Sequence, residues 1–177
     1  AWSTYGENIA KMKSALCWLL TTRGIPQLYY GEEVLMPGVT YPNDGYVRKD
    51  FPGGWIGDKQ NKFLISDRSP QENEIWKLIS TLANYRKYSK ALSIGQLIQY
   101  VPMDGIYVYF RQYESEKIMV IMNTNDNSKN IQFDRFSDQI KNTANCKNLL
   151  TDEIITTPKE LQLNPWETHV FLLIPKK

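Results

Sequence analysis

The sequence predicts an α+β chain, because its hydrophobic pattern changes from a helical period to a strand period partway along. In the first half, apolar residues recur every three or four positions in two separate stretches; from about Leu92 they alternate with polar residues between turn signals. A content of 42% apolar and 12% aromatic residues is enough for a packed core. We therefore divide the chain into residues 1–91 and residues 92–177.

The first element expected is a helix over residues 8–22. Ile9, Met12, Leu16 and Leu20 fall on one face at helical spacing. Gly24 suits the left-handed residue that often ends a helix. The near-continuous apolar run that follows, residues 25–30, is typical of a parallel strand buried on both faces.

A long irregular loop and a second helix complete this half. Residues 34–68 are rich in Gly, Pro, Asp and Asn, and a loop of that length inside a compact domain is usually functional. Ser69, Pro70 and Glu72 then supply an N-cap, a first-turn proline and a capping-box glutamate for a helix over 70–90. Helix, strand, loop and helix in this order are what the last part of a (β/α)8 barrel, a TIM barrel, would contain.

Residues 92–177 predict an antiparallel β-sandwich. Asp104-Gly105 suits the tight turn of a hairpin between residues 96–101 and 106–112. Further strands are expected at 117–122, 131–133, 147–150, 154–156 and 168–174. Several short strands at regular intervals with turns between them are typical of a sandwich.

Three sequence motifs resemble those of the α-amylase superfamily, glycoside hydrolase family 13. The run Gly24–Glu33 resembles the eighth barrel strand of that superfamily, which often reads G-x-P-x-x-Y-Y-G-x-E. Asp50–Trp55, followed by Gly57–Phe63, resembles a bacterial subgroup with D-F-P-G-G-W and G-D-x-x-N-x-F. Arg111 at a strand end, before the Val120–Asn123 strand, resembles the all-β C-terminal domain that follows the barrel.

This resemblance implies that the chain is the C-terminal portion of a glycosidase related to neopullulanases and cyclomaltodextrinases. The parent would hydrolyse α-1,4-glucans such as starch, maltooligosaccharides, cyclodextrins or pullulan with retention, which needs two carboxyl groups about 5–5.5 Å apart. In the superfamily these groups follow the fourth and fifth strands, and a third carboxylate in an H-D motif follows the seventh. His169 is the sole histidine and no Asp follows it, so we expect no catalytic residue in this chain and no activity from it alone.

The candidate substrate-binding residues lie in the segment after the expected eighth strand. They are Glu32, Glu33, Arg48, Phe51, Trp55 and Asp58. Aromatic rings stack on sugar faces, and charged groups hydrogen-bond to sugar hydroxyls. The alternatives are that the glutamates cap a turn or are solvated, and that the two aromatic residues fix the loop to the domain by burial. For Trp166, a sugar platform and a plug at the edge of the sandwich are both compatible with the sequence.

Other classes of function find little support. A net charge of +2 without a Lys/Arg cluster gives no reason to expect nucleic acid, and no apolar run approaches the ~20 residues that span a membrane. Cys17 is expected to be a buried free thiol rather than part of a disulfide. No metal or other cofactor is expected, although calcium binds some members of the family. A binding module for α-glucan and a purely structural β domain remain alternatives to part of an enzyme.

Two further expectations concern the state of the chain. A lone barrel strand would leave open edges and uncovered helix faces, so we expect residues 1–91 either to self-associate or to be partly disordered. The related subgroup acts on glucans outside the cytoplasm, which implies a periplasmic or extracellular parent.

Overall fold

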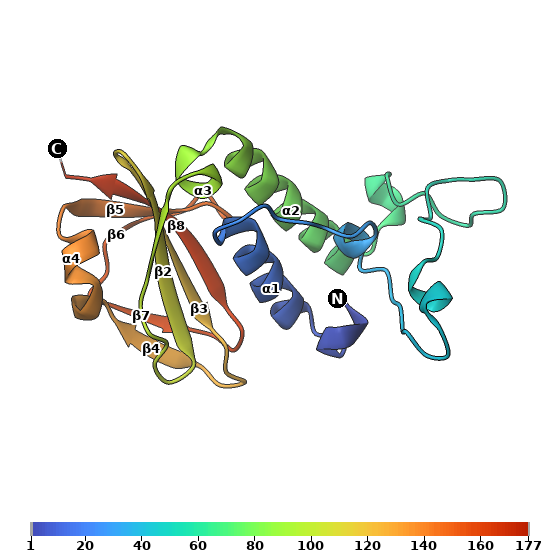
Figure 1. Ribbon diagram of the computed structural model, residues 1–177, viewed down its shortest axis with the longest axis horizontal. Helices are drawn as coiled ribbons and strands as arrows, with labels where there is room; N and C mark the ends of the chain where they lie inside the picture. Colours follow the sequence, from blue (N-terminus) through green and yellow to red (C-terminus); the bar gives the residue numbers. More distant parts are fainter. Residues whose placement is uncertain (1, 177) are drawn as a thin grey trace.

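The computed structural model describes residues 2–176 and has a helical part, an antiparallel sheet and a projecting loop (Figure 1). The helices are α1 (Ile9–Thr21), α2 (Pro70–Tyr88), α3 (Lys90–Ser93) and α4 (Ser137–Ile140). The strands are β1 (Gln96–Gln99), β2 (Ile106–Tyr113), β3 (Glu116–Asn123), β4 (Lys129–Gln132), β5 (Thr143–Asn148), β6 (Ile154–Thr156), β7 (Glu160–Leu163) and β8 (Thr168–Pro175). Short 3-10 helices span Ser3–Tyr5, Glu32–Val34, Asp44–Val47, Ile65–Asp67 and Phe133–Phe136.

Six antiparallel strands form the main sheet in the order β1-β2-β3-β8-β5-β6, and β4 pairs with β7 in a separate two-stranded sheet. Alternate residues of the main sheet face opposite ways, as the two-residue period of a strand requires. Tyr109 and Val120 face α1 and α2, whereas Phe110 and Met119 pack against β4, β7 and the 3-10 helix Phe133–Phe136. The predicted α+β class with an antiparallel sheet is therefore confirmed, although only two strands oppose the main sheet.

The hairpin between β1 and β2 contains the predicted Asp-Gly turn. Asp104 and Gly105 have φ values of 49° and 71°, so both lie in the left-handed region that such a turn requires. A Cβ on Gly105 would approach the side chain of Asn125 to 2.4 Å. Strand β5 ends at Asn148, so residues 149–150, which we had predicted as strand, lie in a turn.

Helices α1 and α2 lie within the ranges 8–22 and 70–90 that their apolar spacing predicts. Ser69 Oγ accepts from the Glu72 N–H, and the Glu72 carboxylate accepts from the Ser69 N–H, so the predicted capping box is confirmed. Gly24 does not end α1, because the helix stops at Thr21 and Thr22 is extended. Gly24 has φ 121° two residues further on.

Two arginines satisfy the carbonyl groups at the end of α1. Arg111, on β2 and only 1% exposed, donates to the Thr21 and Thr22 carbonyls at 2.9 and 2.6 Å and to Gly95 O at 3.1 Å. Arg86, on α2, donates to the carbonyls of Leu20 and Gly24. The last carbonyl groups of a helix lack partners within the helix, so these two side chains join α1 to both α2 and the main sheet.

The predicted strand over residues 25–30 is wrong. Residues 25–29 are without regular structure, and Ile25 is 97% exposed. A strand exists only through hydrogen bonds to a neighbouring strand, and the described part of the chain places none beside this segment. The segment instead leads into Gly31, whose φ of 86° turns the chain into the 3-10 helix Glu32–Val34.

Candidate functional site

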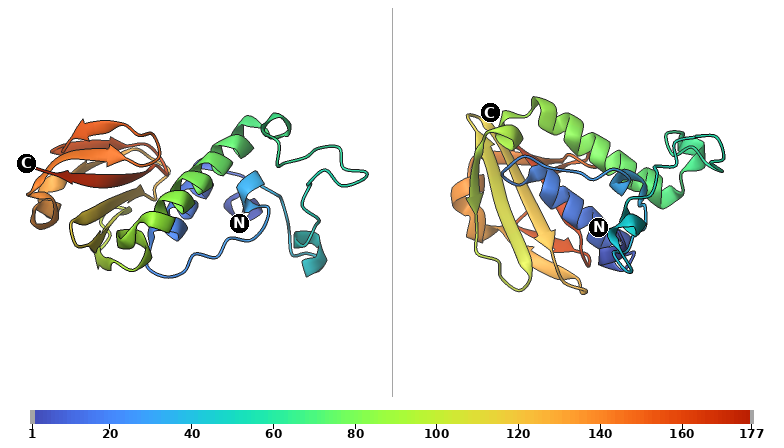
Figure 2. Two further views of the ribbon diagram at one scale, coloured as in Figure 1. Left: turned by 90° about the horizontal axis from the view of Figure 1, so that it is seen from above. Right: turned by 45° about the vertical axis from the view of Figure 1, so that its right-hand side comes forward.

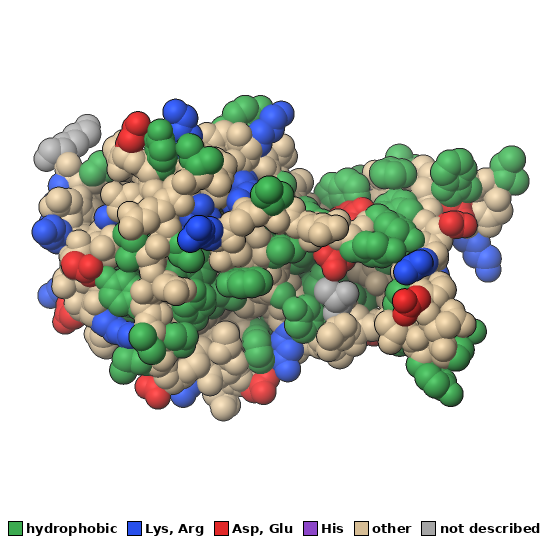
Figure 3. All heavy atoms as spheres, in the orientation of Figure 1, with side chains coloured by type: hydrophobic (Ala, Val, Ile, Leu, Met, Phe, Trp, Pro, Cys, Tyr) green, Lys and Arg blue, Asp and Glu red, His purple; other side chains and the backbone are tan. Residues whose placement is uncertain are grey.

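The loop of residues 37–68, which we call the arm, projects beyond the helices and the sheet in all views (Figures 1 and 2). Within it, only the 3-10 helices Asp44–Val47 and Ile65–Asp67 are regular. Figure 3 shows hydrophobic side chains at the surface of the arm, with charged ones between them. Among the exposed apolar residues are Trp55, Ile56, Phe63, Leu64 and Ile65.

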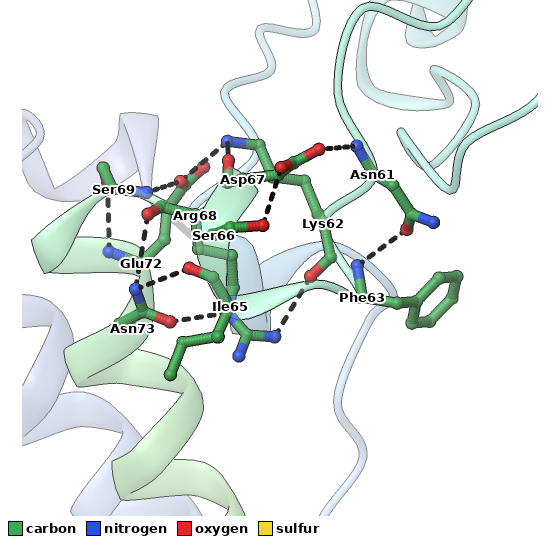
Figure 4. Close-up of polar contacts among 10 residues, drawn as sticks. All are labelled: Asn61, Lys62, Phe63, Ile65, Ser66, Asp67, Arg68, Ser69, Glu72 and Asn73. Carbon is green, nitrogen blue, oxygen red and sulfur yellow. Dashed lines mark hydrogen bonds and ion pairs between the residues drawn. The ribbon is translucent and has the colours of Figure 1, made fainter.

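Polar contacts hold the base of the arm against the start of α2 (Figure 4). Lys62 is only 8% exposed, and its ammonium donates to Glu72 Oε2 and to Asp67 O, each at 2.8 Å. The guanidinium of Arg68 donates to Asn73 Oδ1 at 2.7 Å and to Lys62 O at 3.1 Å. Glu72 therefore serves both the capping box of α2 and the base of the arm.

A hydrogen bond from the Asn61 N–H at 2.7 Å holds the Asp67 carboxylate in place. That bond, a second one from Ser66 and the Lys62 charge together lower the pKa of Asp67 from its ordinary value. The carboxylate is therefore kept ionised as an acceptor that closes the loop between residues 61 and 67.

The outer part of the arm is a turn organised by Asp58. Its carboxylate accepts from the N–H groups of Gly54 and Trp55 at 3.1 and 3.0 Å, and its own N–H donates to Trp55 O at 2.9 Å. Phe51 and Phe63 pack together behind this turn with ring centroids 4.9 Å apart. Trp55 is 72% exposed, so the turn presents the indole to solvent.

A small hollow of about 220 Å³ lies near the start of the arm, and Glu32 is the predicted residue that lines it. Glu32 lines it together with Tyr30 and Lys49, and the Tyr30 hydroxyl donates to the Lys49 carbonyl at 2.9 Å. Hydrogen bonding with Tyr29 raises the pKa of Tyr30. Arg48 forms an ion pair with Asp44, with its Nη2 3.8 Å from Asp44 Oδ2.

The six predicted residues therefore fall into two groups. Glu32, Glu33 and Arg48 lie near the small hollow or on the segments beside it. Trp55 and Asp58 share the outer turn, and Phe51 packs against Phe63 beside it. The Asp58 carboxylate is an acceptor within the turn, and its predicted contact with substrate stays a prediction. The sequence did not reveal the roles of Lys62 and Asp67 at the base of the arm. Asn61 of the Gly57–Phe63 motif precedes Lys62 in the sequence, and its N–H donates to the Asp67 carboxylate.

Other kinds of site find no support in the described residues. Across residues 2–176, no three His, Cys, Asp or Glu side chains are grouped so that they could hold a metal ion. None of the described helices is long and apolar enough to cross a membrane. Cys17 and Cys146 are buried free thiols, as predicted for Cys17, and burial raises the pKa of Cys17 to about 12.

Comparison with known proteins identifies the class to which the sheet region belongs. Residues 97–171 match the sequence model of the cyclo-malto-dextrinase C-terminal domain. Alpha-amylase 3 of Dictyoglomus thermophilum is 29% identical in an alignment that covers 97% of this chain and 36% of that protein. A cyclomaltodextrinase of Thermoanaerobacter pseudethanolicus is 31% identical over 115 residues, which is 65% of this chain and 17% of that protein.

Solved structures agree at the level of the fold. The α-amylase of Geobacillus thermoleovorans complexed with acarbose superimposes with a TM-score of 0.72 at 22% identity, covering 98% of this chain and 35% of that chain. AmyP in complex with maltose gives 0.72 at 19% identity, covering 94% of this chain and 35% of that one. An α-amylase of Niallia circulans is 30% identical over 120 residues, which is 68% of this chain and 19% of that protein. The chain therefore belongs to glycoside hydrolase family 13, the α-amylase superfamily, as a part that contains the C-terminal domain.

Proposed function

We propose that this chain is the C-terminal portion of a retaining α-1,4-glucan hydrolase, and that its arm forms one wall of the parent's glucan-binding cleft. The proposal rests on one observation above all. In a chain whose residues 97–171 match a cyclo-malto-dextrinase C-terminal domain, a buried polar network holds a loop that presents Trp55 to solvent. A rigid, exposed aromatic residue costs little entropy on binding and can stack on a sugar ring.

In this proposal residues 1–91 are the last helix-strand-helix unit of a (β/α)8 barrel. The segment of residues 25–30 would then join a sheet only when the neighbouring barrel strands are present. The exposure of Trp18, Ile25, Tyr29 and Tyr30 supports this, because a surface with several large apolar side chains usually has a partner. In isolation this face is available to a second copy, and light scattering at rising concentration should detect that association.

We further propose that the chain alone does not hydrolyse glycosidic bonds, since none of the family's three catalytic carboxylates can be matched to it. Reducing-sugar release from maltoheptaose by the pure chain should not exceed a buffer blank. Release above the blank that scales with protein concentration would contradict this part of the proposal.

The glucan-contact role is tested by titrating the chain with maltoheptaose while following tryptophan emission. We expect a saturable change that is lost in Trp55→Ala, with a free energy of unfolding unchanged within about 0.5 kcal/mol because the side chain is exposed. Lys59→Ala, another exposed position on the arm, is the control. A titration curve identical in Trp55→Ala and the native chain would remove the arm from the proposed cleft.

The alternative is a purely structural β domain, and a specific observation favours it. Arg111 and Tyr109 of β2 hold the end of α1, the Tyr109 hydroxyl lying 2.5 Å from Thr21 Oγ1. The sheet would then stabilise the barrel without contacting sugar. Absence of any maltoheptaose response at either the arm or the sheet would support this alternative.

A further inference from the structure

A second and larger hollow lies where the helices meet the sheet, on elements other than the arm. This junction groove, of about 590 Å³, runs between α1 and α2 on one side and the start of β8 and the β5–β6 turn on the other. Its volume falls in the ~300–1,000 Å³ range of sites for small molecules. Cys17 and Leu78, both buried, form part of its apolar floor.

One wall of the junction groove is fixed by a chain of hydrogen bonds. Asn148 Oδ1 accepts from the Leu150 N–H at 2.9 Å, so the Asn148 amide nitrogen faces His169 Nδ1, 3.2 Å away. His169 Nδ1 is therefore the acceptor, and Nε2 carries the proton toward Glu167 Oε1 at 3.3 Å. The imidazole also stacks on Phe171, with ring centroids 5.1 Å apart. This wall is preorganised.

Other polar groups of the junction groove are left available. The Lys77 ammonium, the Thr81 hydroxyl and the Glu153 carboxylate all line it, and none makes a side-chain hydrogen bond to any described residue. They come from α2 and from the β5–β6 turn. A donor and an acceptor therefore face the same space from two different elements.

Trp166 also lines the junction groove, and two polar groups contact its ring. Its indole N–H donates to Asp126 Oδ1 at 2.7 Å, and the Lys11 ammonium lies 4.7 Å from the ring centroid. The residue has a φ of 56°, a backbone conformation that residues other than glycine rarely adopt. The ring is thus half-buried and held in place by these two contacts.

The charges in the junction groove select the kind of ligand. The carboxylates of Glu74, Glu153 and Glu167 outnumber the ammonium groups of Lys13 and Lys77, and Lys13 already pairs with Glu74. Burial lowers the pKa of His169, which leaves the imidazole neutral near pH 7. An anion would meet net repulsion here, whereas a neutral ligand with many hydroxyls could use donors, acceptors and the ring together.

We infer that the junction groove is a second binding site, which takes a neutral oligosaccharide through Lys77, Glu153 and the face of Trp166. The choice of a maltooligosaccharide rests on the proposed function. The site is separate from the arm, so a parent that carries both could hold one glucan chain at two places, with a gain in effective concentration.

The test uses the chain labelled with 5-fluorotryptophan and titrated with maltotriose, followed by fluorine NMR. The five tryptophans give separate probes, which single Trp→Phe variants assign. We expect the Trp166 resonance to shift saturably in the native chain and equally in Trp55→Ala. In the double variant Lys77→Ala/Glu153→Ala the dissociation constant should rise at least tenfold. Lys87→Ala, an exposed lysine on α2 outside the groove, should bind normally.

The other outcomes distinguish the junction-groove site from the glucan-contact role proposed for the arm. A shift at Trp55 with none at Trp166 overturns the junction site and leaves the proposed function standing. A shift at Trp166 with none at Trp55 supports the junction site and counts against the arm. An unchanged affinity in the double variant overturns the site as assigned, and no shift at either ring overturns both.

Discussion

The main sheet and the arm differ in which kinds of side chain they bury and which they expose. The sheet buries apolar side chains on both faces, with Val120 and Phe110 completely covered, and joins strands far apart in the sequence. In the arm, Lys62 is buried and pairs with Glu72 of α2, whereas Trp55 and Phe63 are exposed. The polar side chains of the arm form hydrogen bonds at its base, and its aromatic rings face solvent. Exposed aromatic rings on a loop held in this way are typical of a surface that contacts a ligand or another part of a protein.

The junction between helices and sheet should be the most sensitive part of the molecule. Replacing Arg111 with Ala removes the donors to the carbonyls of Thr21, Thr22 and Gly95 and leaves a cavity. We expect the free energy of unfolding to fall by about 4 kcal/mol in urea denaturation.

Arg86→Ala is the matched control, because Arg86 binds the same helix end but is partly exposed. It should cost about 1–2 kcal/mol. Equal losses in the two variants would show that burial of Arg111 on the sheet adds nothing to the junction.

Loss of Lys62 should loosen the arm without unfolding the sheet. In Lys62→Ala the Glu72 carboxylate and the Asp67 carbonyl lose their shared partner in a nearly buried setting. Local opening of the arm should become easier by about 3 kcal/mol, so limited proteolysis within residues 49–61 should accelerate on the order of a hundredfold. Lys59→Ala should be cut at the native rate, and equal cleavage of both variants would count against the bracing role.

A smaller, pH-dependent effect is expected at the wall of the junction groove. Burial lowers the pKa of folded His169 below its ordinary value near 6.5, so the unfolded chain binds the proton more readily. Stability should therefore be fully present above about pH 6.5 and decline as the pH falls below it.

His169→Gln should flatten that part of the stability curve, measured by urea denaturation from pH 8 to pH 5. The Glu167 charge opposes the effect of burial and keeps the difference small. A native chain whose stability changes with pH no more than the variant's would show that His169 does not titrate on unfolding.

The sequence correctly predicted those elements whose ends are marked by residues within the element or directly beside it. Ser69, Pro70 and Glu72 mark the start of α2, and Asp104-Gly105 marks the hairpin, because in both cases nearby residues satisfy the geometry. The strand predicted over residues 25–30 was wrong because a strand needs partners from outside its own segment. Its apolar composition describes a buried strand, but pairing depends on neighbours that the described chain does not place there.

Groups of residues that come from distant segments could not be predicted from the sequence either. Trp55 and Asp58 could be found from their motif, and they do share a turn. Lys77 and Glu153 could not, because they come together only through the packing of α2 against the β5–β6 turn. The bond between Asn148 and His169 likewise depends on the pairing of β5 with β8.

The most direct test of the contrast between sheet and arm is amide hydrogen exchange with and without maltoheptaose. We predict slow exchange in β2 and β3 in both conditions, and slower exchange of residues 51–63 only when the sugar is present. Unchanged exchange throughout the arm at saturating maltoheptaose would contradict the account, because a braced loop that binds glucan must become more protected when it does so.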